Sequence, residues 1–410
     1  MELLNRLFKG DKVIWIIFML LCVISIVEGF SAMGPYRIIR HSLIVFGGFG
    51  LVIWLHNYHY RIASVLILFL PVFIALLIFT LSFGVTLNNA TRWITIFGIS
   101  IQPSELAKLA TVVFVAFMLS RRTPENEKKF FKWIVGVTSI MCILIFLENY
   151  STAFLLFLVV VLMLYIGQLQ LKKLTLIIAT LIFIAGTTVL TLNKLSEDTQ
   201  KAIYETKIIG KGLKNAMNRI NNFGEPLPED SEKYKITDEN RQITHAQIAI
   251  AKGGIFGKSP GYNDQREHLP LPYSDFIYAI IFEDLGLVGA VFVMLLYLWL
   301  LFRVGLIAGK CTRNYPRYLI FGCALMLVMQ ALINMAIVVG LFPVTGQPLP
   351  LISKGGTSIM ITGIYFAIIL SVSRFEIGLG EDEEITEEDV MSEKVSDAEL
   401  FSQQNPIENY

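Results

Sequence analysis

The sequence predicts an all-α polytopic membrane protein with ten transmembrane helices. Of its 410 residues, 54% are hydrophobic and only 16% are charged, and the mean hydropathy is +0.62. This composition is far from that of soluble domains. The apolar residues gather in runs of about 18 to 25, the length at which a helix crosses the hydrocarbon core. Because the runs lack the alternation of barrel strands, helices are the expected way to satisfy their backbone in lipid.

Ten apolar runs follow one another along the chain, and each predicts one span. The first run has no small-residue cleavage site behind it and is followed by further spans. We therefore expect a retained helix and not a removed signal peptide. The predicted spans are residues 13–30, 39–56, 62–83, 103–120, 133–148, 152–168, 174–193, 273–304, 318–342 and 357–373.

Lysine and arginine in the short connections predict the orientation, because cytoplasmic loops carry an excess of basic residues. With ten spans, four basic clusters fall on the same side, and only Arg37 and Arg40 fall on the other. Both termini are therefore expected in the cytoplasm, and residues 194–272 form a large extracytoplasmic loop between helices 7 and 8. The four clusters are Arg6, Lys9 and Lys12; Arg121, Arg122, Lys128, Lys129 and Lys132; Lys172 and Lys173; and Arg303, Lys310, Arg313 and Arg317.

The chain divides into a membrane domain, residues 1–373, and an acidic tail, residues 374–410. The tail is nearly free of aromatic residues and is expected to be a disordered cytoplasmic appendage. The formal net charge of +1 argues against nucleic acid as a partner. Of the four cysteines, three lie in predicted spans and one in an inner loop, so no disulfide framework and no metal site are indicated.

Asp275 lies where the long outer loop re-enters the membrane, in the segment His268-Leu-Pro-Leu-Pro-Tyr-Ser-Asp275. A carboxylate at that point is costly unless it caps a helix or takes part in chemistry at the bilayer surface. Ser and Asp are both residue types that satisfy the free N–H groups of a helix start. Capping of span eight and chemistry therefore both stay open. Glu283 and Asp284 lie further along the span, off the Asp275 face, and a structural role is expected for both.

Glu105 and Lys108 are three residues apart at the start of span four, so they share one helix face. Pro103, directly before them, suits the first turn of a helix. One interpretation is a mutual ion pair that lowers the cost of burying each charge. The other is that the two side chains line a polar cavity inside the helix bundle. The two interpretations are compatible.

Arg92 and Trp93 precede span four on the outer side. Trp at a membrane interface is a common anchor, whereas Arg is suited to bidentate contact with phosphate oxygens.

Further on, Gly257-Lys-Ser259 looks like the end of a nucleotide-binding phosphate loop. That motif needs Gly five residues before Gly257, where Lys252 stands, and we reject it.

Four segments, taken together and in order, resemble the shape–elongation–division–sporulation family, which includes FtsW, RodA and SpoVE. Each segment alone is a weak signal, but the four with ten predicted spans are a strong one, and the likeness covers nearly the whole chain to about Arg374. The segments are Asn89-Ala-Thr-Arg-Trp-Ile94 with Gln102-Pro-Ser-Glu-Leu-Ala-Lys108; Gly253-Gly-Ile-Phe-Gly-Lys258; Ser274-Asp-Phe-Ile-Tyr-Ala279 with Glu283-Asp-Leu-Gly-Leu-Val-Gly289; and Pro343-Val-Thr-Gly-Gln-Pro-Leu-Pro-Leu-Ile-Ser-Lys-Gly-Gly-Thr-Ser358.

The resemblance implies a peptidoglycan glycosyltransferase in the cytoplasmic membrane. Such an enzyme polymerises lipid II, an undecaprenyl-pyrophosphoryl disaccharide-peptide, at the outer face, beside a class B penicillin-binding transpeptidase. It implies Asp275 as the catalytic residue, a general base for the attacking sugar hydroxyl. The implied substrate-binding set is Arg92, Trp93, Gln102, Glu105 and Lys108.

The leaving pyrophosphate accumulates negative charge, so nearby cations are expected to stabilise the transition state. Arg92, Lys108 and Lys354 are the candidates, and a divalent cation (Mg²⁺ or Mn²⁺) could share this task. Lys354 stands where many relatives have Tyr, in Ser353-Lys-Gly-Gly356. A second departure is Asn149, which stands where the family has Asp, so no functional role is carried onto it.

Within the family, the modest length, short outer loops and acidic tail resemble the division branch more than the elongation branch. A place at the division septum, among other divisome proteins, is then expected. Three alternatives stay open: a transporter that flips lipid II, an elongation polymerase of the RodA type, and a non-enzymatic scaffold that recruits a transpeptidase.

Overall fold

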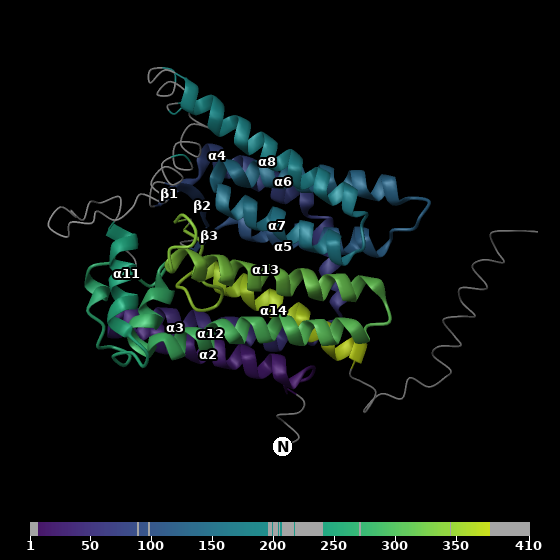
Figure 1. The fold of residues 1–410 in the computed structure, drawn as a ribbon. Coiled ribbons are helices and arrows are strands. Elements are labelled where there is room, and N and C mark those ends of the chain that lie inside the picture. Colours follow the sequence, from purple (N-terminus) through teal and green to yellow (C-terminus); the bar gives the residue numbers. More distant parts are fainter. Residues whose placement is uncertain are drawn as a thin grey trace, which may run out of the picture.

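The computed structural model of the chain is mostly helical (Figure 1). It describes residues 7–87, 90–96, 99–195, 241–269, 272–344 and 346–377, with single positions at 199, 204, 206 and 217. Residues 378–410 of the predicted tail, which begins at residue 374, and most of the predicted outer loop lie outside the described residues.

Among the described residues, seven helices are long and apolar enough to cross a membrane. Each overlaps a predicted span. α5 has the predicted bounds, and the ends of the others differ by a few residues because apolar runs do not mark where the last turn of a helix stops. The seven are α2 (Lys12–Met33), α3 (Pro35–Leu55), α5 (Pro103–Ser120), α6 (Glu127–Glu148), α12 (Ile277–Lys310), α13 (Asn314–Val338) and α14 (Gly356–Ile377).

Three further apolar segments of the described chain are also helical. The third predicted span is a bent pair, η1 (Tyr60–Ile67) and α4 (Leu70–Phe83), whose axes differ by 56°. The sixth is α7 (Tyr150–Ile166), only 17 residues long, and the seventh is α8 (Leu171–Lys194). With seven helices that meet the length and hydropathy needed for a span, or eight if the bent pair counts as one, the count of ten stays a prediction.

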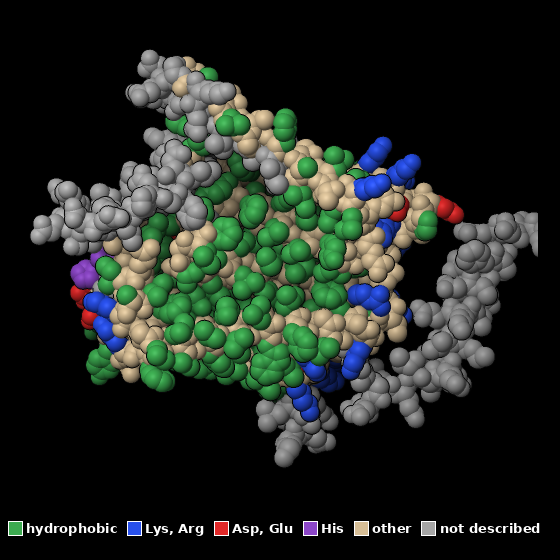
Figure 2. Space-filling model, in the orientation of Figure 1, with side chains coloured by type: hydrophobic (Ala, Val, Ile, Leu, Met, Phe, Trp, Pro, Cys, Tyr) green, Lys and Arg blue, Asp and Glu red, His purple; other side chains and the backbone are tan. Residues whose placement is uncertain are grey.

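The surface of the helical body is that of a membrane protein. A broad belt of hydrophobic side chains separates two ends at which charged side chains gather (Figure 2). Large apolar residues of α6 and α12, among them Ile143, Leu295 and Phe302, are 52–64% exposed. Exposed apolar area of this extent is stable when lipid covers it.

The all-α prediction missed a small antiparallel sheet ahead of α5. Its strands are β1 (Val85–Leu87), β2 (Ala90–Ile96) and β3 (Ile99–Ile101), in the order β1-β2-β3. The β-branched and aromatic run from Thr91 to Ile96 favours an extended backbone, so the signal was present in the sequence. No element was predicted between the third and fourth spans, because membrane-span patterning hides so short a sheet.

The predicted outer loop contains a helix, α11 (Arg241–Gly253), which packs on the first part of α12. α12 itself breaks at Gly286, whose φ of 69° and ψ of −169° are not helical. The chain from Gly254 to Ser259 binds this break: Leu287 N donates to Gly254 O at 2.9 Å, and Ser259 N donates to Asp284 O at 2.9 Å. Backbone groups released by the break are thereby satisfied, as burial requires.

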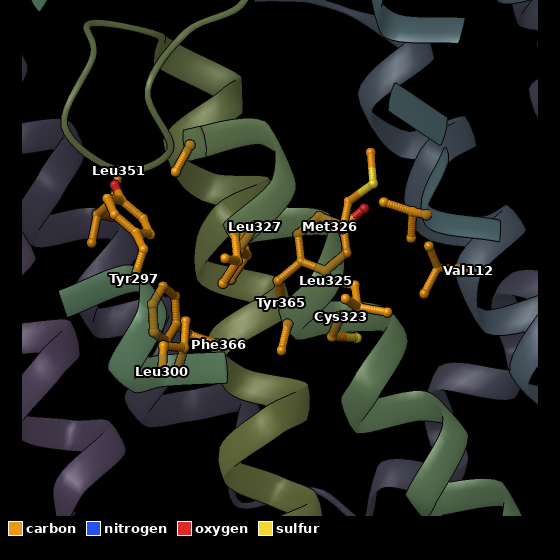
Figure 3. Packing of buried hydrophobic residues seen from close by; sticks show 14 of the residues in the cluster. Val112, Tyr297, Leu300, Cys323, Leu325, Met326, Leu327, Leu351, Tyr365 and Phe366 are labelled. Atoms are coloured by element: carbon orange, nitrogen blue, oxygen red, sulfur yellow. The ribbon is translucent and has the colours of Figure 1, made fainter. Parts of the chain in front are cut away.

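The core lies where α12, α13 and α14 meet. Figure 3 shows Tyr297, Leu300, Leu327, Tyr365 and Phe366 packed between these helices; each is at most 3% exposed. Tyr297 lies directly beneath the loop that carries Leu351. This packing supplies a rigid floor for the segment between α13 and α14, which forms part of the site described next.

Candidate functional site

Asp275 lies in a turn two residues before α12 and is half-buried. The N-cap of α12 is Phe276, and no side chain makes a capping hydrogen bond there. Asp275 itself therefore does not occupy the N-cap position, and its catalytic role stays a prediction. Its Oδ1 accepts a hydrogen bond from Ser274 Oγ at 2.9 Å.

The backbone around Asp275 is held by α13 and by the segment after it. Asn334 Nδ2 donates to Asp275 O at 2.8 Å and to Gln347 O at 2.7 Å. Ser353 Oγ donates to Ser274 O at 2.6 Å. Asn334 is 1% exposed, so these bonds form away from water, where losing a donor is most costly.

Residues 346–355 form a buried loop, called here the re-entrant loop, between α13 and α14. Buried backbone carbonyls need partners, and side chains of neighbouring helices supply them. Besides the bond from Asn334, the loop carbonyls accept from Gln330 Nε2 (to Pro348, 2.9 Å), Tyr297 Oη (to Pro350, 2.5 Å) and Ser25 Oγ (to Leu351, 2.8 Å). Leu351 has a φ of 67°, a costly value for a branched residue that this network holds in place.

Glu105 and Lys108 form the ion pair that their spacing predicted, with Lys108 Nζ 2.8 Å from Glu105 Oε1. Lys108 is fully buried and also donates to Gln330 Oε1 at 3.1 Å. Gln330 and Asn334 are one turn apart on α13 and therefore share a face. Gln330 and Asn334 hold the adjacent carbonyls of Pro348 and Gln347, so the loop backbone links the Glu105–Lys108 pair to Asp275.

Lys354 lies against the same segment. Its N–H donates to Tyr273 O at 2.8 Å, and its Nζ lies 4.4 Å from the centroid of the Tyr273 ring. Burial lowers the pKa of Lys354, and the positive charges of Arg37 and Arg40 lower it further. Arg37 and Arg40, the two exceptions to the charge rule for orientation, therefore lie near Lys354.

The remaining predicted residues lie on the sheet or directly after it. Gln102, 8% exposed, is the N-cap of α5 and donates from Nε2 to Ser104 Oγ at 3.0 Å. Trp93 is half-buried on β2, and Arg92 precedes it on that strand, with its side chain outside the described residues. Thr357 Oγ1 donates to Ser100 O at 3.2 Å, which ties β3 to the end of the re-entrant loop.

Sequence reasoning missed the amide side chains that hold the site together. Gln330, Asn334 and Gln347 are polar residues 7%, 1% and 2% exposed. The signal was their presence within or beside an apolar span, where polar residues are expensive and usually have a purpose. Gln347 Nε2 donates to Thr152 Oγ1 at 2.5 Å, so α7 is joined to the same network, while Asn149 accepts from Ser151 N as the N-cap of α7.

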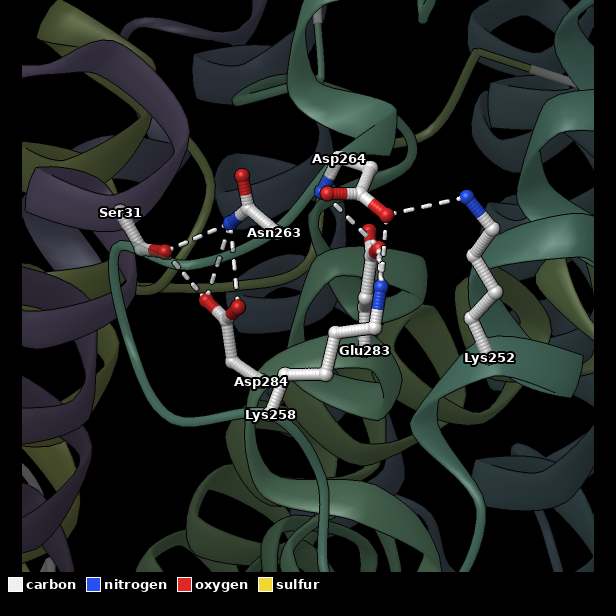
Figure 4. A network of polar contacts seen from close by, with 7 residues as sticks. All are labelled: Ser31, Lys252, Lys258, Asn263, Asp264, Glu283 and Asp284. Carbon is white, nitrogen blue, oxygen red and sulfur yellow. Dashed lines mark hydrogen bonds and ion pairs between the residues drawn. The ribbon is translucent and has the colours of Figure 1, made fainter.

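Glu283 and Asp284 belong to a second network, separate from the Asp275 segment (Figure 4). Lys258 Nζ lies 2.7 Å from Asp264 Oδ2 and 3.4 Å from Glu283 Oε1. The hydrogen bonds from Lys258 and Lys252 lower the pKa of Asp264 to about 2. The contacts of Glu283 and Asp284 are consistent with the structural role expected for both. Among the described residues no three His, Cys, Asp or Glu side chains form a group that could hold a metal ion.

The Gly-rich segment before Lys258 packs against protein backbone. A Cβ on Gly253 would lie 1.9 Å from Phe282 O, and one on Gly257 would lie 2.2 Å from Asp284 O. Glycine is required here so that two backbones approach closely. This geometry explains Gly257-Lys-Ser259 without a bound phosphate.

Comparison with known proteins gives a consistent result. The sequence model of the FtsW, RodA and SpoVE family, described as cell cycle protein, matches residues 8–377. A protein of Buchnera aphidicola subsp. Baizongia pistaciae named "probable peptidoglycan glycosyltransferase FtsW" is 32% identical over 311 residues, 74% of this chain and 74% of that protein. A protein of the same name from Dichelobacter nodosus is 31% identical, over 77% of this chain and 75% of its own length.

Two solved structures share the fold. A chain from a peptidoglycan synthase complex superposes with a TM-score of 0.69 at 22% identity, covering 89% of this chain and 98% of that chain. The rod shape determining protein RodA of Thermus thermophilus gives a TM-score of 0.63 at 21% identity, covering 90% of this chain and 98% of that one. Since the family model covers nearly the whole chain, this protein belongs to the FtsW, RodA and SpoVE family of cell cycle proteins.

Proposed function

We propose that the protein is a peptidoglycan glycosyltransferase that polymerises lipid II at the outer face of the cytoplasmic membrane. Its curated relatives carry this activity in their names. The observation that carries the proposal at the level of residues is the position of Asp275. It is a half-buried carboxylate that does not occupy the N-cap of its helix and whose backbone is fixed by Asn334.

In the proposed reaction Asp275 is the general base. The sugar hydroxyl of the acceptor attacks the anomeric carbon of the donor while Asp275 takes the hydroxyl proton. The bond from that carbon to the pyrophosphate oxygen breaks, and the pyrophosphate leaves with the electron pair. A positioned base contributes about 10²- to 10⁴-fold to such a step. Direct displacement with one base inverts the anomeric centre.

Cations near Asp275 are proposed to stabilise the leaving pyrophosphate. Lys354, with Arg37 and Arg40 close enough to lower its pKa, supplies positive charge on the side of the Tyr273–Asp275 segment. We keep Arg92 and Trp93 as contacts for the phosphate and the interface, and Gln102 as a polar contact near the start of α5. A divalent cation (Mg²⁺ or Mn²⁺) at the pyrophosphate is part of the proposal.

For Glu105 and Lys108 we propose a supporting role in substrate binding. Lys108 is fully buried, and its Nζ bonds to Glu105 and Gln330. Gln330 in turn holds the carbonyl of Pro348 in the re-entrant loop. We therefore propose that the Glu105–Lys108 pair acts on the substrate through the re-entrant loop, which carries Lys354.

We further propose ten spans, with both termini in the cytoplasm and α11 in the extracytoplasmic loop. The strands, α11 and the start of α12 lie at one end of the helical body (Figure 1), which supports one outer face for the site. A class B penicillin-binding transpeptidase is the proposed partner, and the likeness in fold to a chain of a peptidoglycan synthase complex supports it. A role at the division septum is proposed from the names of the relatives.

The test is polymerisation of purified lipid II by the full-length protein, with and without the candidate transpeptidase and with and without EDTA. Glycan chains that appear with the partner support the proposal. In liposomes, movement of lipid II between leaflets without any polymer would instead indicate a flippase. If neither polymer nor lipid movement is detected, the remaining alternative is the non-enzymatic scaffold.

A further inference from the structure

His41 is a buried polar side chain for which the proposed reaction has no role. It lies near the start of α3 and is 1% exposed. A Cβ on Gly29 of α2 would lie 3.1 Å from His41 Cδ2, so glycine at this position leaves room for the imidazole ring between the two helices. A polar ring held this tightly away from water is costly to bury unless it is hydrogen-bonded.

The hydrogen-bond partner of His41 is Ser25 of α2, and the direction of the bond between them is fixed. Ser25 Oγ lies 3.0 Å from His41 Nε2, 2.8 Å from Leu351 O and 3.4 Å from Ile352 O. A hydroxyl group has a single hydrogen, and a carbonyl oxygen can only accept. The Ser25 hydrogen is therefore directed at the loop carbonyls, and His41 Nε2 donates to Ser25 Oγ.

Leu351 is a position of the re-entrant loop where such a link matters. Its φ of 67° is a costly value for a branched residue and persists where the surrounding contacts determine it. Ser25 supplies one of these contacts, and His41 orients the Ser25 hydroxyl. A chain of two hydrogen bonds therefore runs from α3 through α2 to the carbonyl of Leu351.

The next residues of the re-entrant loop contact the segment that carries the proposed base. Ser353 Oγ donates to Ser274 O at 2.6 Å. Lys354 N donates to Tyr273 O at 2.8 Å. Both acceptors belong to the two residues directly before Asp275. A loop released at its start would shift these contacts, and a displacement of about 1 Å at a reacting group costs about 10²-fold in rate.

We infer that His41 is a positioning residue for polymerisation: by orienting Ser25 it holds Leu351, and with it the loop that contacts the Asp275 segment. The inference rests on the proposed function. In this role His41 acts through Ser25 and not on the substrate, so the loop depends on the hydrogen-bond donor and not on the imidazole ring as such. An amide that reaches Ser25 should replace His41, whereas an apolar side chain of similar size should not.

The experiment compares His41→Gln, which keeps a donor, with His41→Leu, which does not. The full-length proteins are placed in lipid nanodiscs, and polymerisation of lipid II and the unfolding temperature are measured. We expect His41→Leu to polymerise about tenfold more slowly or worse, with an unfolding temperature close to that of the parent. His41→Gln should regain most of the parental rate.

His56→Leu is the matched control. His56 is fully buried at the other end of α3, where its Nδ1 lies 3.0 Å from Val52 O of the same helix. This variant should polymerise as the parent does. Ser25→Ala breaks the proposed link from its other side. Combined with His41→Leu, it should add no more than about twofold to the larger single loss, because the two residues act through one path.

Hydrogen–deuterium exchange, measured by mass spectrometry, supplies a readout that does not depend on polymerisation. The amides of Ser353 and Lys354 donate to Leu349 O and Tyr273 O, so they are protected while the loop stays in place. They should exchange faster in His41→Leu and in Ser25→Ala than in the parent. Exchange in His41→Gln and His56→Leu should match the parent.

Parental polymerisation by His41→Leu, or unchanged exchange in its re-entrant loop, would overturn the inference. His41→Gln that polymerises as poorly as His41→Leu, with the same fall in unfolding temperature, would overturn it as well, since that pattern indicates packing of the ring alone. If the parent makes no glycan chains, the proposed function fails, whereas the exchange measurements still decide whether His41 holds the loop.

Discussion

The side-chain amide of Asn334 donates a 2.8 Å hydrogen bond to the main-chain oxygen of Asp275. Its other proton goes to Gln347 O at 2.7 Å, so one residue of α13 fixes both the proposed base and the re-entrant loop. The position of the base is thereby coupled to the loop that carries Lys354. The first prediction tests this coupling.

Replacing Asn334 by Ala removes both bonds and leaves two carbonyls without their donor. Each such loss costs about 1–3 kcal/mol when the group is buried. We expect polymerisation of lipid II to fall about 10- to 100-fold, measured as glycan-chain yield, while the protein stays folded. Asn57→Ala, an exposed amide elsewhere in the chain, should keep full yield. Parental yield from Asn334→Ala would show that the coupling is irrelevant to the reaction.

Replacing Lys108 by Met leaves Glu105 as an uncompensated buried charge. Such a change costs about 3–5 kcal/mol, whereas replacing both partners costs much less than the sum of the single changes. Unfolding measurements on Lys108→Met, Glu105→Gln and the double variant should therefore be strongly non-additive. Lys173→Met is the control, because Lys173 and Glu127 form a pair that is about a quarter exposed and worth about 0–1 kcal/mol. Additive losses at positions 105 and 108 would contradict the buried pair.

Replacing Gly253 by Ala places a Cβ 1.9 Å from Phe282 O. The two backbones must then separate, and overpacking of this kind costs about 1–3 kcal/mol. We expect a lower unfolding temperature and reduced polymerisation, because the first part of α12 moves. Gly136→Ala in α6 is the matched control: nothing lies within 4 Å of its Cβ, and alanine favours the helix. Equal stability of the two variants would refute the close packing.

The lowered pKa of Lys354 leads us to expect that polymerisation declines at alkaline pH. Burial and the charges of Arg37 and Arg40 lower its pKa below the ordinary lysine value of 10.5, so the charge is present at neutral pH and is lost earlier than usual as pH rises. Polymerisation should decline as pH rises through that lowered pKa. Lys354→Arg keeps its charge and should move the decline to higher pH, whereas Lys252→Arg should leave the profile unchanged. An identical profile for Lys354→Arg would exclude Lys354 as the cation that matters.

The length of the apolar runs was enough to predict most of the helices. They could not predict the bend between η1 and α4, or the break at Gly286, because both preserve hydropathy and change only backbone angles. The three strands were also hidden, since Thr91 to Ile96 is too short to stand out beside long apolar runs. Local pattern predicts element type better than it predicts interruptions.

For the site, the sequence singled out the charged residues and missed the amides. The spacing of Glu105 and Lys108 predicted their ion pair, because i and i+3 share a helix face. Asn334 and Gln330 bond to partners far along the chain, at Asp275, Gln347 and Pro348, and no local spacing reveals such contacts. The sequence also could not place the start of α12, which lies at Ile277 and leaves Asp275 before the N-cap.

The proposed polymerisation reaction depends most directly on Asp275 acting as the general base. The decisive measurement is the rate of glycan-chain formation from lipid II by purified Asp275→Ala, together with its unfolding temperature. We predict a loss of about 10²- to 10⁴-fold with an unfolding temperature close to that of the parent. Asp275→Ala that polymerises lipid II at the parental rate would contradict the central claim.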